Sequence, residues 1–269
     1  MYYGLINSMN KTVAPSYTAR TTAFATATGI TDTTILGALN TFDLGLISNS
    51  LDTKMKAIYP FVGGTSTTQK FNFMDARDLN AAFRLQFSGG GTFSATGYKP
   101  NGTNAYADTF FKPITNGSLT ANNNHIAIYS RTSAGSDYYN AGAETFPAAN
   151  ALNIFVNRTD GSAGYDSGTY TLNRNSYSNG DGKGYYLGTV NSDLSSRAYK
   201  NGILKNTTSI TNMALTDVNV YLATTNPINL YTSQEMALFH IGTGLSSADC
   251  ISLSTLVQNL QTSLGRQVW

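Results

Sequence analysis

The sequence predicts a mainly β protein: a β-sandwich with a short helical segment before it and a helix after it. Three observations predict this fold. After residue 60, apolar and polar residues alternate with a period of two in several segments, as strands with one buried face require. Clusters of Gly, Asn and Ser separate these segments, as turns do. Before and after this region the period changes to that of a helix.

Two helices are expected before the strands. Residues 18–28 are rich in Ala and end at Gly29, which favours a helix C-cap. Residues 32–58 repeat apolar side chains at helical spacing, and Pro60 would end that helix. The repeating side chains are Ile47, Leu51, Met55 and Ile58.

Half-buried strands are expected wherever the period is two. In the first of these segments Ile126 and Ile128 would lie on one face. The dipeptide Asn201-Gly202 predicts a type I′ hairpin turn, because both residues adopt positive φ at little cost. The expected strands cover residues 125–131, 152–156, 170–172, 184–190, 218–222 and 237–241.

A final amphipathic helix is expected near residue 250. Ser246 and Asp249 have the spacing of a capping box, and Gly265 would supply the C-cap. Its apolar stripe consists of Leu253, Leu256, Val257, Leu260 and Leu264. The expected division is an N-terminal attachment or helical segment over residues 1–58 and a sandwich domain over residues 59–269.

Composition argues against several kinds of function. Charged residues make up 12% of the chain, against about 25% in an average protein. The net charge is +2 and no basic stripe is present, so no nucleic-acid partner is expected. Cys250 is the single cysteine, so no intrachain disulfide can form. Neither a signal peptide nor an apolar run of ~20 residues is found, so we expect a protein made in the cytoplasm with no membrane partner.

The acidic residues do not form a recognisable catalytic pattern. Glu144 and Glu235 are the only glutamates and lie far apart, whereas sandwich glycosidases need two carboxylates flanking the bond. Asp75 and Asp78 are close in sequence, but their position beside Arg77 favours a turn with a local ion pair. The two histidines fall in expected strands with no acid nearby. We therefore expect no enzyme and no catalytic residue.

One loop resembles part of a calcium site. Residues 179–184 read Asn-Gly-Asp-Gly-Lys-Gly, in which Asp181 could supply an oxygen ligand. The loop is short and poor in acids, so an ordinary glycine turn is the favoured interpretation and no cofactor is expected.

Tyrosines in polar segments are the remaining suggestive feature. Tyr gives large contact area at small entropic cost, and neighbouring Asn, Ser and Gly supply adaptable hydrogen bonds. The alternative is that these tyrosines only cap the sandwich core, and both interpretations stay open. The candidate ligand-binding residues are Tyr138, Tyr139, Asn140, Tyr185 and Tyr186.

Five separated segments resemble a group of bacteriophage structural proteins. They are residues 54–65 (KMKAIYPFVGGT), 75–85 (DARDLNAAFRL), 100–109 (PNGTNAYADT), 239–245 (FHIGTGL) and 264–267 (LGRQ). Their order and spacing agree with that group, and the resemblance extends over about residues 18–267. It implies a concanavalin A-like, laminin-G-like jelly roll.

The resemblance also implies a role. Proteins of this group are virion surface components, namely fibres, spikes or capsid decorations, so the virion surface is the expected location. We expect partners among other virion proteins, a homotrimer by analogy with fibres, and a host-surface glycan as ligand. The alternatives are a purely structural decoration protein and, less favoured, an enzyme acting on polysaccharide. Residues 1–17 have no counterpart in the group; their attachment candidates are Met1, Tyr2, Tyr3, Leu5 and Ile6.

Overall fold

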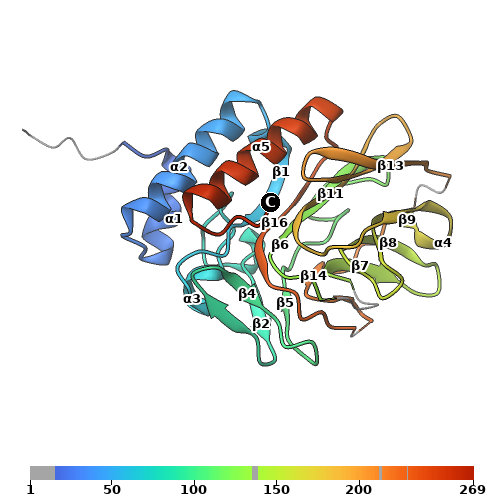
Figure 1. Ribbon diagram of the computed structural model, residues 1–269, viewed down its shortest axis with the longest axis horizontal. Coiled ribbons are helices and arrows are strands. Elements are labelled where there is room, and N and C mark those ends of the chain that lie inside the picture. Colours follow the sequence, from blue (N-terminus) through green and yellow to red (C-terminus); the bar gives the residue numbers. More distant parts are fainter. Residues whose placement is uncertain (1–15, 135–138, 212–213, 229) are drawn as a thin grey trace, which may run out of the picture.

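The computed structural model describes residues 16–134, 139–211, 214–228 and 230–269. Figure 1 shows three layers, in which helices α1 (Ala19–Thr28), α2 (Thr33–Ser48) and α5 (Ser247–Ser263) cover one side of a β-sheet. The other side of that sheet packs on a second sheet. The predicted β-sandwich with N-terminal helices and a C-terminal helix is confirmed.

The helix-covered sheet, here called sheet 1, has eight strands. They are β1 (Met55–Tyr59), β3 (Thr92–Ser94), β4 (Gly97–Lys99), β6 (Asn123–Ser130), β11 (Gly184–Asn191), β12 (Ser195–Lys200), β13 (Ile203–Ser209) and β16 (Met236–Gly242). Their order is β13-β12-β11-β6-β16-β4-β3, with β1 also paired to β16. All of these pairings are antiparallel, and β13 forms one edge.

The opposite sheet, sheet 2, also has eight strands. They are β2 (Gln86–Ser88), β5 (Tyr106–Asp108), β7 (Ala141–Thr145), β8 (Asn150–Phe155), β9 (Ser162–Thr169), β10 (Arg174–Ser178), β14 (Tyr221–Leu222) and β15 (Thr225–Asn226). Their order is β10-β9-β8-β7-β14-β5-β2, and β15 adds a short parallel pairing to β7.

Local sequence signals set the helix ends. The Thr18 hydroxyl accepts from the Thr21 amide at the start of α1, and Gly29 ends that helix at φ 69°. At the start of α5, Ser246 and Asp249 form the predicted capping box. The shorter helices are η1 (Asp52–Lys54), α3 (Ser66–Gln69), η2 (Asn80–Ala82) and α4 (Tyr170–Asn173).

Strand β6 is buried on both faces, not on one as its sequence predicts. Ile126 and Ile128 point into the core between the sheets, whereas Ala127 and Tyr129 pack under the helices. The second apolar core arises because three helices cover sheet 1. Polar–apolar alternation therefore failed to indicate how deeply this strand lies.

Two secondary-structure predictions were wrong. The helix expected to reach residue 58 ends at Ser48, because Asn49 leaves helical geometry and Ser50 adopts φ 55°. Met55 and Ile58, which fit a helical stripe by spacing, lie in β1, so the boundary expected at residue 58 falls within a strand. Residues 170–172, expected as a strand, lie in α4.

The predicted hairpin at Asn201-Gly202 is present and connects β12 to β13. Asn201 has φ 53° and Gly202 has φ 78°, as a type I′ turn requires. The register then shifts, because Tyr199 pairs with Leu204 and Ala198 with Asn206. Lys205 is therefore the extra residue of a β-bulge in the edge strand.

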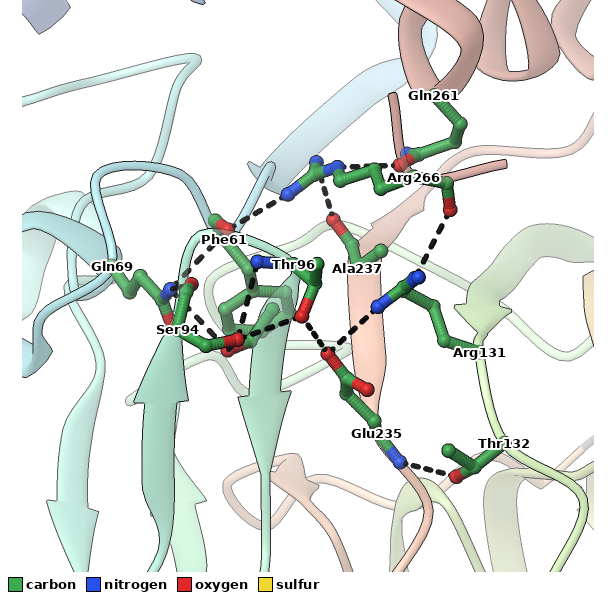
Figure 2. Close-up of polar contacts among 11 residues, drawn as sticks. Phe61, Gln69, Ser94, Thr96, Arg131, Thr132, Glu235, Ala237, Gln261 and Arg266 are labelled. Atoms are coloured by element: carbon green, nitrogen blue, oxygen red, sulfur yellow. Dashed lines mark hydrogen bonds and ion pairs between the residues drawn. The ribbon is translucent and has the colours of Figure 1, made fainter. Parts of the chain in front are cut away.

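Arg266 forms an extensive buried polar network (Figure 2). Its guanidinium donates to the carbonyls of Pro60 (2.6 Å), Phe61 (2.9 Å) and Ala237 (2.9 Å) and to the side chain of Gln261 (2.7 Å). The Arg266 carbonyl accepts from Arg131 Nε at 3.0 Å. Burial lowers the pKa of Arg266 to about 9.

This network joins segments of the chain that lie far apart in the sequence. Arg266, from residues 264–267, fixes the backbone at Pro60 and Phe61 in residues 54–65. Tyr59 stacks on Phe239, from residues 239–245, with ring centroids 6.1 Å apart. Three of the five segments singled out in the sequence therefore contact one another in the fold.

Among the described residues, no helix is long and apolar enough to span a bilayer.

Candidate functional site

A polar groove opens where the edge of sheet 2 meets the edge of sheet 1. The turn after β10 forms one wall, and the β12–β13 hairpin, whose strands contact β10, forms the other. We call it the lysine groove. It has a volume of about 350 Å³ and is lined by Tyr177, Ser178, Asn179, Gly180, Asp181, Lys200, Asn201, Ile203 and Lys205.

Lys200 is held rigidly at the centre of this groove. Its ammonium donates to Asn179 Oδ1 at 2.8 Å and to the Asp181 carbonyl at 2.7 Å, and it lies 5.1 Å from the Tyr186 ring centroid. An ammonium has three N–H donors. In the described part of the chain, no protein atom accepts a hydrogen bond from the third.

Asn179 acts as the support for Lys200. It is 6% exposed, and its amide donates to the Val156 carbonyl at 2.5 Å and to the Tyr186 hydroxyl at 3.0 Å. Its side chain is therefore fixed before any ligand arrives. Burial lowers the pKa of Lys200; Asp181 opposes this change and Lys205 adds to it.

Two further side chains complete the groove. Lys205, at the bulge, is exposed and makes no hydrogen bond or ion pair with any described residue. Tyr177 packs partly against the sandwich core and lines the groove beside Ile203. The groove thus combines an aromatic ring, a fixed amide and two ammonium groups.

Asp181, the weak metal candidate, lies in this groove against the ammonium of Lys200. Its carboxylate accepts from the Lys183 amide at 3.0 Å, and its carbonyl is bonded by the Lys200 ammonium. A positive charge already occupies that position and would repel a divalent cation. Within the described ranges, no three His, Cys, Asp or Glu side chains come together as a metal would require.

Tyr139 and Asn140, two of the predicted ligand-binding residues, lie in the interior. Tyr139 is 7% exposed, and its hydroxyl accepts from Arg174 at 2.7 Å. Asn140 is 1% exposed; its side chain accepts from the Val156 amide at 2.9 Å and donates to Gln234. Tyr139 and Asn140 thus make internal hydrogen bonds and offer little surface to a ligand.

Tyr185 and Tyr186 belong to strand β11 and not to a loop. Successive side chains of a strand point to opposite faces, so Tyr185 packs under the helices and Tyr186 between the sheets. The Tyr186 hydroxyl donates to the Asp181 carbonyl at 2.5 Å and so shapes the groove from below. Both side chains are almost fully buried, so they offer little surface to a ligand.

The other predicted candidates lie outside the described residues. They are Tyr138 and the attachment candidates Met1, Tyr2, Tyr3, Leu5 and Ile6.

A second polar cluster lies on the outer face of sheet 2. Asn153, Asp166 and Arg174 face one another across β8, β9 and β10, and Arg174 binds both Asp166 oxygens at 2.8 and 2.9 Å. Glu144 lies beside them, 1% exposed, and neither carboxylate oxygen has a hydrogen-bond partner. Burial, and secondly the Asp166 charge, raise the pKa of Glu144 to about 7.

This cluster is closed to ligands in the structure. Asn153 Oδ1 fills the position that a side chain at the neighbouring Gly142 would take.

The other glutamate, Glu235, accepts from Arg131 at 3.1 Å and from Thr96 at 2.5 Å (Figure 2). Asp75, as predicted, forms a local ion pair with Arg77 at 2.5 Å.

Comparisons with known proteins define the class of the fold. No protein-family model matches the sequence, and neither does any curated protein. Domain 4 of an extracellular arabinanase from Geobacillus stearothermophilus, solved in complex with arabinotriose, is similar in structure with a TM-score of 0.54 and 11% identity. The match covers 75% of this chain and 98% of that domain.

Botulinum neurotoxin binding domains are similar as well. The serotype D domain gives a TM-score of 0.53 at 11% identity, covering 77% of this chain and 53% of that one. The serotype G domain gives 0.51 at 12% identity, covering 76% and 51%. The chain thus spans about half of the toxin domains and has a lectin-like, concanavalin A-like β-sandwich, the fold class predicted from the sequence.

Of the residues that line the lysine groove, only Asp181 was a candidate, and it was considered as a metal ligand. Residues 179–184 and Asn201-Gly202 were recognised as turns, but nothing in the sequence places the two turns side by side. Only the pairing of β12 with β13, and the packing of both on β10, brings them together.

Proposed function

We propose that the chain is a glycan-binding β-sandwich of a bacteriophage virion surface protein and that the lysine groove is its binding site. The observation that carries the glycan-binding part is Lys200, which Asn179 and Asp181 fix while one of its N–H donors meets no acceptor among the described residues. A preformed donor is what a ligand rich in hydroxyl groups requires.

The other lining groups suit the same ligand. Sugars present hydroxyls that both donate and accept, together with apolar ring faces. The Asn201 amide and the Asp181 carboxylate can bond hydroxyls, while Tyr177 and Ile203 supply apolar contact. The similarity of the fold to a domain solved with arabinotriose supports this proposal.

The virion part of the proposal rests on the five phage-like segments. Its test is mass spectrometry of purified particles, followed by imaging of particles labelled at this protein. We expect the protein on the particle surface, as a fibre, spike or decoration. Its absence from purified particles would refute the virion assignment without affecting the glycan-binding assignment.

A glycan array tests the binding part. The folded chain is compared with Lys205→Ala, in the groove, and with Lys99→Ala, an exposed strand lysine outside it. We expect a defined set of glycans to bind the wild type and Lys99→Ala but to bind Lys205→Ala more weakly. Silence of a well-folded wild type would favour the alternative, a decoration protein that contacts only other virion proteins.

Hydrolysis is a separate outcome. We expect that incubation with host capsule or cell-wall polysaccharide releases no reducing ends. Their release would establish the enzymatic alternative, and Glu144 and Asp166 would then be the first residues to replace.

A further inference from the structure

We propose that the lysine groove selects acidic glycans, whose anionic group binds between the ammonium groups of Lys200 and Lys205. This inference rests on the proposed glycan-binding function and names the class of sugar.

The groove concentrates charge on a chain that carries little. Three of its nine lining residues are charged, whereas charged residues make up 12% of the whole chain. Two of the three are lysines. The single acid, Asp181, already bonds a backbone amide through its carboxylate and bonds Lys200 through its carbonyl only. No carboxylate therefore bridges the two lysines.

Lys200 has the properties of an anion-binding group held in place in advance. Two of its donors are engaged by fixed oxygens, so little side-chain entropy remains to be lost when the third binds a ligand. The two ammonium groups also repel each other, as the effect of Lys205 on the pKa of Lys200 indicates. An anion placed between them would relieve that repulsion.

Strand alternation places the second lysine in the same groove. Lys205 lies two residues after Ile203, so both side chains point to the same face of β13, and both line the groove. A bulged edge lysine also protects a sheet edge from pairing with other strands. If Lys205 only protected the sheet edge, Lys200 would not need to be fixed, and replacing Lys205 would not change glycan binding.

The experiment compares acidic and neutralised forms of one glycan. An array carrying uronate, sialate, sulfate and neutral glycans identifies the preferred group. Calorimetry then measures the dissociation constant of an oligogalacturonate or other acidic hit against its methyl ester, or against its desulfated form. We expect the acidic form to bind at least tenfold more tightly, with the difference shrinking as salt rises from about 50 to 500 mM.

Variants assign the effect to the groove. We expect Lys205→Ala to weaken acidic glycan binding about tenfold and Lys205→Glu to weaken it further, while Lys205→Arg and Lys99→Ala bind like the wild type. Lys205 is exposed, so these variants should fold. Circular dichroism and the midpoint of urea unfolding verify this.

The possible failures are distinguishable. If a glycan binds equally well in its acidic and neutralised forms, the preference for acidic glycans is wrong while glycan binding stands. The same holds if Lys205→Glu leaves acidic binding unchanged. If no glycan of either kind binds the folded wild type, the proposed function and this inference both fail.

Discussion

His125 Nε2 lies 3.0 Å from His240 Nδ1, and this contact orients a buried chain of hydrogen bonds. The Thr243 carbonyl, 2.5 Å from His125 Nδ1, can only accept, so His125 carries its proton on Nδ1. His125 Nε2 therefore accepts from His240 Nδ1, and His240 Nε2 accepts from the Tyr185 hydroxyl at 2.7 Å. Both rings are neutral in this arrangement.

Acid should destabilise the fold through these two rings. Burial lowers the pKa of His125 to about 4. Burial also lowers the pKa of His240, and a positive charge on His125 would lower it further. The unfolded chain takes up protons near pH 6.5, so this stability is present above pH 6.5 and is lost as pH falls towards 4. For His125 the loss is about 3 kcal/mol. Urea unfolding at several pH values measures it.

Nitrogen-15 NMR of the imidazoles checks the cause directly, because the chain has only two histidines. At pH 6 we expect two neutral rings, each protonated at Nδ1. A ring that titrates near pH 6.5 would contradict the buried hydrogen-bond chain.

Tyr185→Phe should lower the free energy of unfolding by about 1–2 kcal/mol, because it leaves His240 Nε2 buried without a donor. Tyr106→Phe is the matched control, since no described residue hydrogen-bonds the Tyr106 hydroxyl. Equal effects of the two substitutions in urea unfolding would argue against a structural role for the Tyr185 hydroxyl.

Glu144→Gln should stabilise the protein at alkaline pH. The pKa of Glu144 is raised in the folded state, so its contribution to stability is present below pH 4.5 and is lost as pH rises through about 7. We expect a gain of about 1 kcal/mol at pH 8 and little change at pH 5. Glu235→Gln should instead destabilise, because Glu235 pairs with Arg131. Thermal unfolding of both variants at the two pH values decides the matter.

Arg266→Met should lower the free energy of unfolding by about 3 kcal/mol or more. The substitution removes donors from three backbone carbonyls and from Gln261 in a buried site. Gln267→Met, which replaces the exposed residue next to Arg266, should change the free energy of unfolding little. Urea unfolding that shows the same midpoint for Arg266→Met and the wild type would exclude the network as a source of stability.

Gly202→Ala should lower the free energy of unfolding by about 1 kcal/mol, because Gly202 has φ 78° and an added Cβ would lie 3.2 Å from the Ser254 Cβ. Gly180→Ala is the control, since its Cβ would meet nothing within 4 Å and Gly180 does not adopt positive φ. Thermal unfolding measures both. No difference between them would mean that the hairpin turn tolerates a side chain.

Local signals in the sequence predicted those parts of the fold that depend on near neighbours. The Asn201-Gly202 turn, the Ser246 capping box and the strands β6, β11 and β16 all follow from residues a few positions apart. The end of α2 was missed because Met55 and Ile58 satisfy a helical spacing and are also buried in a strand.

Burial and the site depend on distant contacts, which no local pattern reveals. Tyr185 and Tyr186 have the composition of a recognition loop, yet the helices cover one and the second sheet covers the other. Lys200 and Lys205 are ordinary strand lysines until β10 packs against their hairpin. The predictions therefore contained both turns and Asp181 but not the groove that they form together.

The pairing of β1 with β16 has a consequence for how the chain folds. Sheet 1 joins a strand at residues 55–59 to one at residues 236–242, and the helices that cover it also come from opposite ends of the described chain. Closing so long a loop loses much chain entropy before the strands gain contacts, which slows folding. Until β16 is in place, the apolar underside of α2 and the edge of β1 stay uncovered. A chaperone or early assembly with a second chain would be most valuable during that interval.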